Sequence, residues 1–99
     1  MYHEKHCDRC LELLGAKWSM VHRWLDALAR VNPSAPFDVH HRKHRHNLEG
    51  VETIRAVWGD AAAEAAILHI KDDIYGPCPH TDAQKIPKDE KEYESWGMQ

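Results

Sequence analysis

The sequence lacks a long hydrophobic run, since none of its apolar stretches approaches the roughly 18 to 20 residues of a membrane-spanning helix. No apolar segment follows Met1, so we expect neither membrane insertion nor a secretory signal. Cysteine is scarce and its number, three, is odd, which excludes a disulfide-rich framework and favours a soluble protein of the reducing cytoplasm. Positive charge is not in excess, because 13 Lys and Arg stand against 16 Asp and Glu, and this argues against a nucleic-acid partner.

Strand signals and internal repeats are also missing. No Asn-Gly or Asp-Gly turn separates alternating apolar residues. Apolar residues recur instead at steps of three and four, which predicts helices over residues 2–14, 18–28, 38–58 and 61–75. The sequence therefore predicts an all-α protein with a single small domain of about four helices.

The ends of these predicted helices carry recognisable stop and start residues. Gly15 and Gly76 close the first and last helices, and the prolines of segment 32–36 close the second. Asp38 and Asp60 are predicted N-caps of the third and fourth helices, because a carboxylate can accept hydrogen bonds from free backbone N–H groups.

The domain boundaries follow from the same signals. A connection as short as Gly59 and Asp60 predicts that the third and fourth helices form an antiparallel hairpin. We assign residues 1–79 to the helical domain. We expect residues 80–99 to form a polar tail that is partly ordered or packed on this domain.

What the sequence has in abundance is histidine, with nine residues in 99. His69 and Asp73 lie four positions apart on a predicted helix, so both side chains can reach one partner. That partner is either a metal ion or an arginine, because an unpaired buried carboxylate is costly. The spacing leaves both alternatives open.

The densest histidine segment covers residues 40–46. Counting back along an unbroken helix from Leu48 and Val51 places His41 and His44 on the inward face, whereas His46 lies on a different face of the helix. Inward His41 or His46 could join His69 and Asp73 as metal ligands. The alternative is a solvated basic helix start, and this is the better interpretation for His40 and His44. A His-His nuclease motif at His40 and His41 is not favoured, because the β-hairpin that such a motif requires is not predicted before them.

Two further features involve possible ligands elsewhere. Two close pairs of possible ligands, Cys7 with Cys10 and Cys78 with His80, form the pattern of a weaker second site for structural zinc. Ordinary thiols are the simpler interpretation. His22 lies among apolar residues of the second helix. It is interpreted as a core histidine unless that helix packs against the one carrying His69 and Asp73.

The order of motifs resembles a family of small bacterial and phage proteins classed as a domain of unknown function. The resemblance spans roughly residues 3–77. It rests on these elements: His3-x-x-His6, Gly15, Val21-His22-Arg23-Trp24, Asp38-x-x-His41-Arg42, His46 with Glu49-Gly50, Trp58-Gly59, His69-Ile70-x-x-Asp73 and Gly76-Pro77. It implies a bacterial protein and supplies no activity. The three cysteines are not part of the pattern.

The resemblance selects five residues over His40 and His44 as the site, namely His22, His41, His46, His69 and Asp73. Imidazoles with a carboxylate suit a divalent metal such as zinc, iron or manganese. The first alternative is a protein with a structural or interaction role, whose His–Asp–Arg network involving Arg42 only stabilises helix packing. The second is a metal-dependent hydrolase, although the adjacent His-Asp doublet of helical phosphohydrolases is missing.

We expect the site to lie between the second, third and fourth helices. Among partners, a membrane is not expected. A domain this small that exposes tryptophan is a candidate for homodimerisation.

Overall fold

The computed structural model describes residues 3–27, 45–76 and 79–96. Within these ranges the chain is helical and contains no β-strand. The helices are α1 (His3–Leu14), α2 (Ser19–Asp26), α4 (Leu48–Trp58), α5 (Asp60–Tyr75) and α6 (Glu90–Ser95). The prediction of an all-α fold is therefore confirmed. None of these described helices has the length and apolarity needed to cross a membrane.

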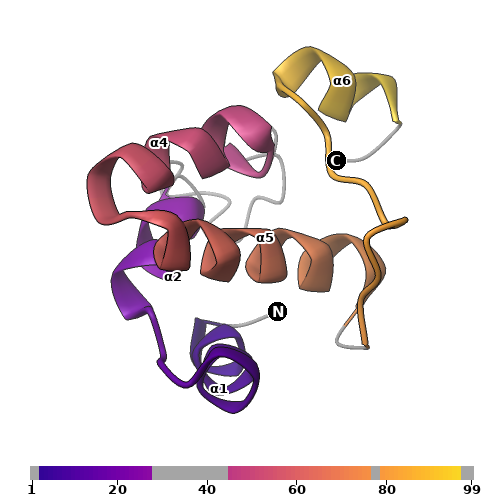
Figure 1. Cartoon of the computed structure of the whole chain (residues 1–99). Coiled ribbons are helices and arrows are strands. Elements are labelled where there is room, and N and C mark those ends of the chain that lie inside the picture. The colour runs from indigo at the N-terminus through magenta and orange to yellow at the C-terminus, as the bar shows by residue number, and fades with distance from the viewer. Residues whose placement is uncertain (1–2, 28–44, 77–78, 97–99) are drawn as a thin grey trace, which may run out of the picture.

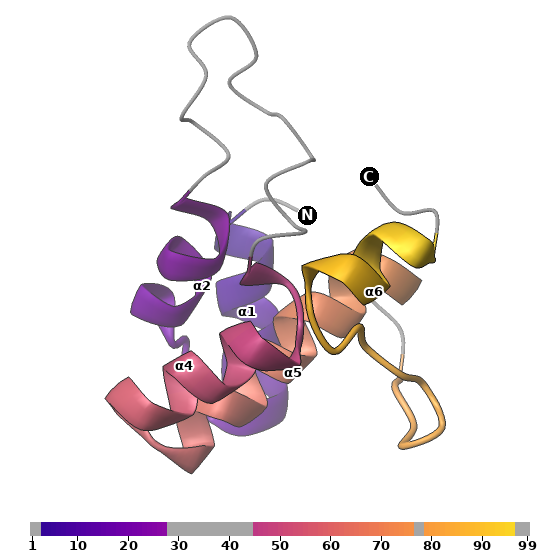
Figure 2. The same ribbon diagram turned by 90° about the horizontal axis from the view of Figure 1, so that it is seen from above.

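Helix α5 is the centre of the fold and contacts α1, α2 and α4. Figure 1 shows α4 and α1 on opposite sides of α5, and Figure 2 shows the same helices from above. The buried face of α5 begins with alanines that are all 0% exposed: Ala62, Ala63, Ala65 and Ala66. Because the distance between packed helices depends on the side chains at their contact, these small residues allow close approach. Groups further along α5 are thereby brought near several other elements.

The predicted hairpin of the third and fourth helices corresponds to α4 and α5, which pack closely against each other, and this prediction is confirmed. A single residue joins them: Gly59 has φ +96°, a left-handed conformation that glycine adopts readily. The predicted N-cap role of Asp60 is wrong. Asp60 is the first residue of α5, makes no capping hydrogen bond, and accepts instead from Arg55 Nη1 at 2.7 Å.

The prediction of an unbroken helix over residues 38–58 is also wrong where the structure describes it. The chain bends at His46 and Asn47, and α4 begins at Leu48. The Asn47 side chain is the N-cap and accepts a hydrogen bond from the Gly50 backbone N–H at 2.8 Å. The predicted cap Asp38 lies outside the described residues. Helical counting therefore does not extend backwards across His46.

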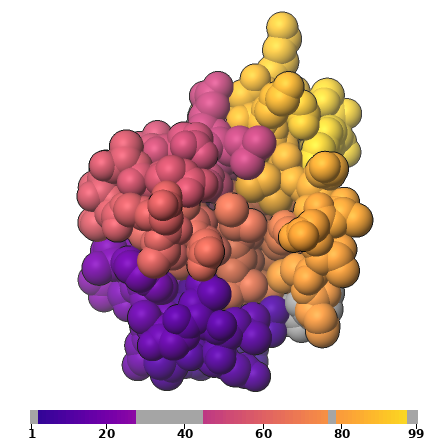
Figure 3. Space-filling model, viewed as in Figure 1, coloured from indigo at the N-terminus to yellow at the C-terminus, as the bar shows by residue number. Residues whose placement is uncertain are grey.

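The C-terminal segment is joined to the start of α4 by backbone hydrogen bonds. The carbonyls of Pro87 and Lys88 accept from the N–H groups of Leu48 and Glu49 at 2.8 and 3.1 Å. The first N–H groups of a helix have no partner within that helix, so these carbonyls satisfy two of them. In α6, Tyr93 is 2% exposed. Figure 3 shows this yellow segment beside α4 on the molecular surface.

Alanine in place of Gly50 is expected to destabilise the protein by about 2 kcal/mol or more. A Cβ atom at this position would lie 1.9 Å from the backbone carbonyl oxygen of Arg45, so the turn that carries Arg45 and His46 would have to move. Urea unfolding measures the loss, and Thr53→Ala, exposed on the same helix, is the control. A Gly50→Ala protein as stable as the wild type would contradict the prediction.

Candidate metal centre

Imidazoles and carboxylates from four parts of the chain meet beside the central helix. We call this cluster the His/Asp site, and its members are His6, His22, Asp26, His46, His69 and Asp73. Helix α1 contributes His6, and the turn before α4 contributes His46. Helices α2 and α5 each contribute a histidine and an aspartate four positions apart, a spacing that puts both side chains on one helix face.

Four of these residues bring one ligand atom each to within 4.8 Å of one another: Asp26, His46, His69 and Asp73. His69 Nε2 lies 3.3 Å from both Asp26 Oδ1 and Asp73 Oδ2. On the other side, His46 Nε2 lies 3.3 Å from Asp26 Oδ1, and His46 Nδ1 lies 3.4 Å from Asp73 Oδ2. The two carboxylates are therefore each flanked by the same two imidazoles.

The remaining two imidazoles lie behind the residues that α5 contributes. His22 Nδ1 is 2.8 Å from His69 Nδ1, a hydrogen bond between two buried rings. His6 Nε2 is 3.3 Å from Asp73 Oδ1, the carboxylate oxygen that faces away from His69. The rings of His6 and His69 are stacked with centroids 3.5 Å apart. The residues of α5 thus have imidazoles on both sides.

Several nitrogen atoms of these buried rings have no hydrogen bond. His6 Nδ1 and His22 Nε2 are in this state, and His6 Nε2 and His69 Nε2 have only their 3.3 Å contacts with carboxylate oxygens. The rings themselves are no more than 1% exposed, so water does not compensate at the surface. A buried polar atom without a partner costs about 1 to 3 kcal/mol, and such groups in a native fold call for an explanation.

The protonation states favour neutral rings beside ionised carboxylates. Burial lowers the pKa of His22 to about 3 and that of His46 to about 4, from 6.5. For Asp73, burial acts to raise the pKa, but the neighbouring His6 and His69 outweigh it and hold the pKa below the usual carboxyl range. Neutral imidazole and ionised carboxylate are the forms in which these residues bind metal ions.

The potential at His69 is different. Burial acts to lower its pKa, but the carboxylates of Asp26 and Asp73 raise it above 6.5. The point between these two carboxylates therefore attracts positive charge, in the form of a proton or of a cation.

The structure brings together four of the five residues that the sequence selected: His22, His46, His69 and Asp73. The fifth, His41, lies outside the described residues, as does Arg42. Sequence reasoning missed Asp26, and His6 entered it only through the motif His3-x-x-His6 of the resemblance. The signal for Asp26 was present, since His22 and Asp26 have the same four-residue spacing that identified His69 and Asp73.

Beside the His/Asp site lies a separate buried ion-pair network centred on Asp72, which is 2% exposed. Arg9 donates to both Asp72 oxygens at 3.0 and 3.1 Å. His80 Nε2 is 2.7 Å from Asp72 Oδ1, and His80 Nδ1 is 3.0 Å from Gln84 Oε1. The network joins α1, α5 and the segment after α5.

The predicted second zinc site at Cys7, Cys10, Cys78 and His80 stays a prediction, because Cys78 lies outside the described residues. Cys7 Sγ lies 3.4 Å from His3 Nε2 and 3.6 Å from Ser19 Oγ. His80 has both ring nitrogens in the Asp72 network. Cys10 is 0% exposed in the core.

The Cys10 thiol is expected to resist alkylation in the native protein. Burial, with a smaller contribution from Cys7, raises the pKa of Cys10 to about 12. Since the thiolate is the reactive form, its reaction with a maleimide at pH 8 is expected to be about a thousandfold slower than that of an ordinary thiol. Peptide mapping after labelling in native and in denaturing buffer measures the difference. Equal labelling of Cys10 in both buffers would refute it.

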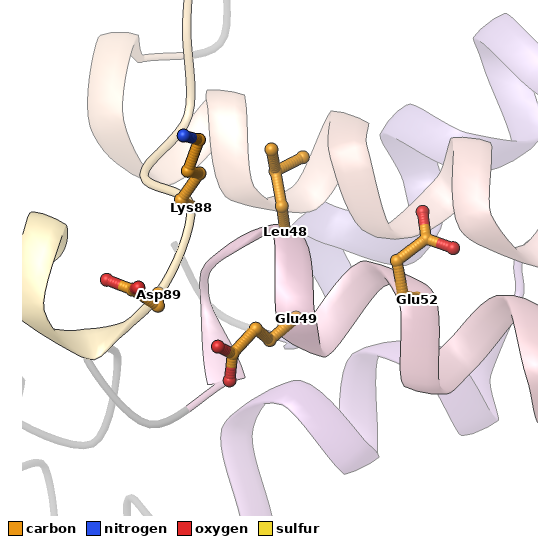
Figure 4. A pocket seen from close by; sticks show the side chains of 5 residues that line it. All are labelled: Leu48, Glu49, Glu52, Lys88 and Asp89. Carbon is orange, nitrogen blue, oxygen red and sulfur yellow. The ribbon is translucent and has the colours of Figure 1, made fainter.

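A surface groove of about 410 Å³ lies elsewhere, between the first turns of α4 and the segment that leads into α6. Figure 4 shows its lining residues, which are Leu48, Glu49, Glu52, Lys88 and Asp89. None of them belongs to the His/Asp site.

Comparison of the chain with protein-family models, with curated proteins and with solved structures finds no match. The resemblance to a family of small bacterial and phage proteins therefore stays a prediction.

Proposed function

We propose that this protein binds a divalent transition metal ion through Asp26, His46, His69 and Asp73. The observation that supports this proposal is the spacing of the donor atoms. Metal–nitrogen and metal–oxygen bonds of about 2.0 to 2.1 Å in a tetrahedral site place neighbouring ligand atoms about 3.3 to 3.4 Å apart. Three of the nitrogen–oxygen distances within this group, two from His69 Nε2 and one from His46 Nε2, are 3.3 Å.

Hydrogen bonding alone accounts less well for the same contacts. Nitrogen–oxygen hydrogen bonds have most often a length of about 2.9 to 3.0 Å. His69 Nε2 is buried and lies 3.3 Å from two carboxylate oxygens, longer than this usual length for both. An ion placed between these atoms would contact the lone pair of His69 Nε2 and both oxygens at once.

The chemistry of the donor set narrows the choice of metal. The two groups of ligand atoms contain imidazole and carboxylate, and neither contains a thiolate. Mixed nitrogen and oxygen ligands suit zinc, iron and manganese, whereas copper(I) and iron–sulfur clusters require sulfur. We therefore propose zinc, iron(II) or manganese(II) as the bound ion.

The test is elemental analysis of the full chain, expressed without a histidine tag and purified without a metal column. We expect one tightly held ion per chain, and calorimetric binding of zinc, iron(II) or manganese(II) after chelator treatment. His69→Ala is expected to abolish the binding. Lys71→Ala is the control, because Lys71 lies on the same helix, contacts the Thr81 carbonyl outside the site, and should leave metal content unchanged.

Two results would overturn the proposal. One is a purified wild-type protein that contains no metal and gives no calorimetric signal with any of the three ions. The other is a His69→Ala variant that retains the wild-type metal content. Either result would leave the His/Asp site as a network that only supports helix packing.

A further inference from the structure

The short contact between His22 and His69 determines which nitrogen of His69 is available to bind a metal. The two Nδ1 atoms lie 2.8 Å apart in the protein interior. A neutral imidazole has one N–H donor and one acceptor nitrogen, so in this pair one Nδ1 donates and the other accepts. The two choices have opposite consequences at the far nitrogens.

If His69 Nδ1 carries the proton, His69 Nε2 has a free lone pair, and this atom faces Asp26 Oδ1 and Asp73 Oδ2 at 3.3 Å. If His22 Nδ1 carries the proton, His69 Nε2 becomes an N–H group and cannot bind a metal. Metal-binding histidines commonly donate their second ring N–H to another group, which fixes the tautomer and the ring orientation. In this protein the group at that position is His22, whose Nδ1 lies 2.8 Å from His69 Nδ1.

The same pairing bears on whether His22 itself is a ligand. His6, His22 and His69 form a second group of ligand atoms within 4.8 Å, which would suit a second ion. However, a neutral His22 that accepts at Nδ1 carries its proton at Nε2, and a nitrogen that bears a proton is not a ligand. The hydrogen bond therefore assigns His22 a supporting role, although the sequence predicted it as a ligand.

We propose that His22 is a positioning residue that accepts a hydrogen bond from His69 Nδ1 and thereby directs the His69 Nε2 lone pair into the metal position. This inference rests on the proposed metal binding. It adds that α2 supplies the acceptor that fixes the tautomer of His69 when an ion occupies the site.

The closing experiment begins with a spectrum of the zinc-loaded wild-type protein. Nitrogen-15 NMR of the histidine side chains is expected to show His69 with its proton at Nδ1 and His22 with its proton at Nε2. A zinc-loaded protein in which His22 Nδ1 carries the proton would overturn the inference. A wild-type protein that binds no zinc would contradict the proposed function instead, so the two failures are distinguishable.

The second part compares two substitutions of similar size at the same position. In His22→Asn the amide oxygen occupies the place of Nδ1 and can accept from His69, whereas His22→Leu offers no acceptor. We expect His22→Asn to bind zinc with nearly wild-type affinity and His22→Leu to bind about 10- to 100-fold more weakly. The stoichiometry should stay at one ion per chain.

The outcomes separate the alternatives. A purely structural role would leave both variants with the zinc affinity of the wild type. A ligand role would instead weaken zinc binding in His22→Asn as much as in His22→Leu. Two ions in the wild type and one in the variants would show that His22 holds a second ion. Each of these results would overturn the positioning role. If His22→Leu does not fold, the wild-type spectrum and the His22→Asn affinity still decide the question.

Discussion

Asn in place of Asp73 is expected to leave the purified protein without bound metal and to cause the largest loss of stability under metal-replete conditions. Asp73 is the residue that α5 places between His6 and His69, with one oxygen toward each ring. Replacing one carboxylate oxygen by an amide NH2 group removes the charge and the anionic ligand while keeping the side-chain size. An ion bound only by the native state stabilises it by about 4 kcal/mol when its concentration is a thousandfold above Kd, and this contribution is lost.

The measurement is denaturant unfolding with and without added zinc, together with metal content after dialysis. Zinc should stabilise the wild type and leave Asp73→Asn unaffected. The adjacent Asp72→Asn is an informative control, because it alters the neighbouring carboxylate without altering the His/Asp site. An Asp73→Asn protein that zinc stabilises as strongly as the wild type would refute the ligand role of Asp73.

The second large effect is expected at Asp72, where a substitution should lower stability without changing metal binding. Its carboxylate is fully buried and accepts from Arg9 at two atoms while contacting His80. Breaking a buried ion pair by removing one partner typically costs about 3 to 5 kcal/mol, since the other charge is left without compensation. We expect Asp72→Ala to lower the free energy of unfolding by about this amount, and to leave the metal content of the folded protein unchanged.

Urea unfolding measures this loss, and a double-mutant cycle with Arg9→Met isolates the pair. Coupling of Arg9 with Asp72 is expected to account for a large part of the effect. Additive losses in the cycle would show that the two residues stabilise the fold independently. Loss of metal from folded Asp72→Ala would show that the two aspartates of α5 belong to one site.

The sequence predicted those parts of the fold that depend on local signals. Gly59 and Gly76 mark helix ends by backbone conformation, and both have positive φ in the structure. The hairpin followed from the short connection at Gly59 alone. His69 and Asp73 were identified because a four-residue spacing on a helix is a local geometric fact.

The rest of the site depends on how segments distant in the sequence pack, and helical periodicity was misleading there. Counting from Leu48 and Val51 favoured His44 over His46, because it assumed one continuous helix. The Asn47 cap interrupts that helix and turns His46, 1% exposed, toward α2 and α5. The resemblance selected His46 by pattern, whereas His44 lies outside the described residues. His6 enters the site only because α1 packs against α5.

The wide separation of the site residues along the chain has a consequence for folding kinetics. His22 and His69 are 47 residues apart in sequence, so their pairing requires closure of a long loop, which is entropically costly. We therefore expect the donor atoms of α1, α2 and α5 to come together late in folding, after the helices have docked. An ion that bridges them would stabilise the native state more than the folding transition state. At a zinc concentration a thousandfold above Kd, we expect unfolding to be about a thousandfold slower and the refolding rate to be almost unchanged, which would make the loaded protein long-lived rather than fast-folding.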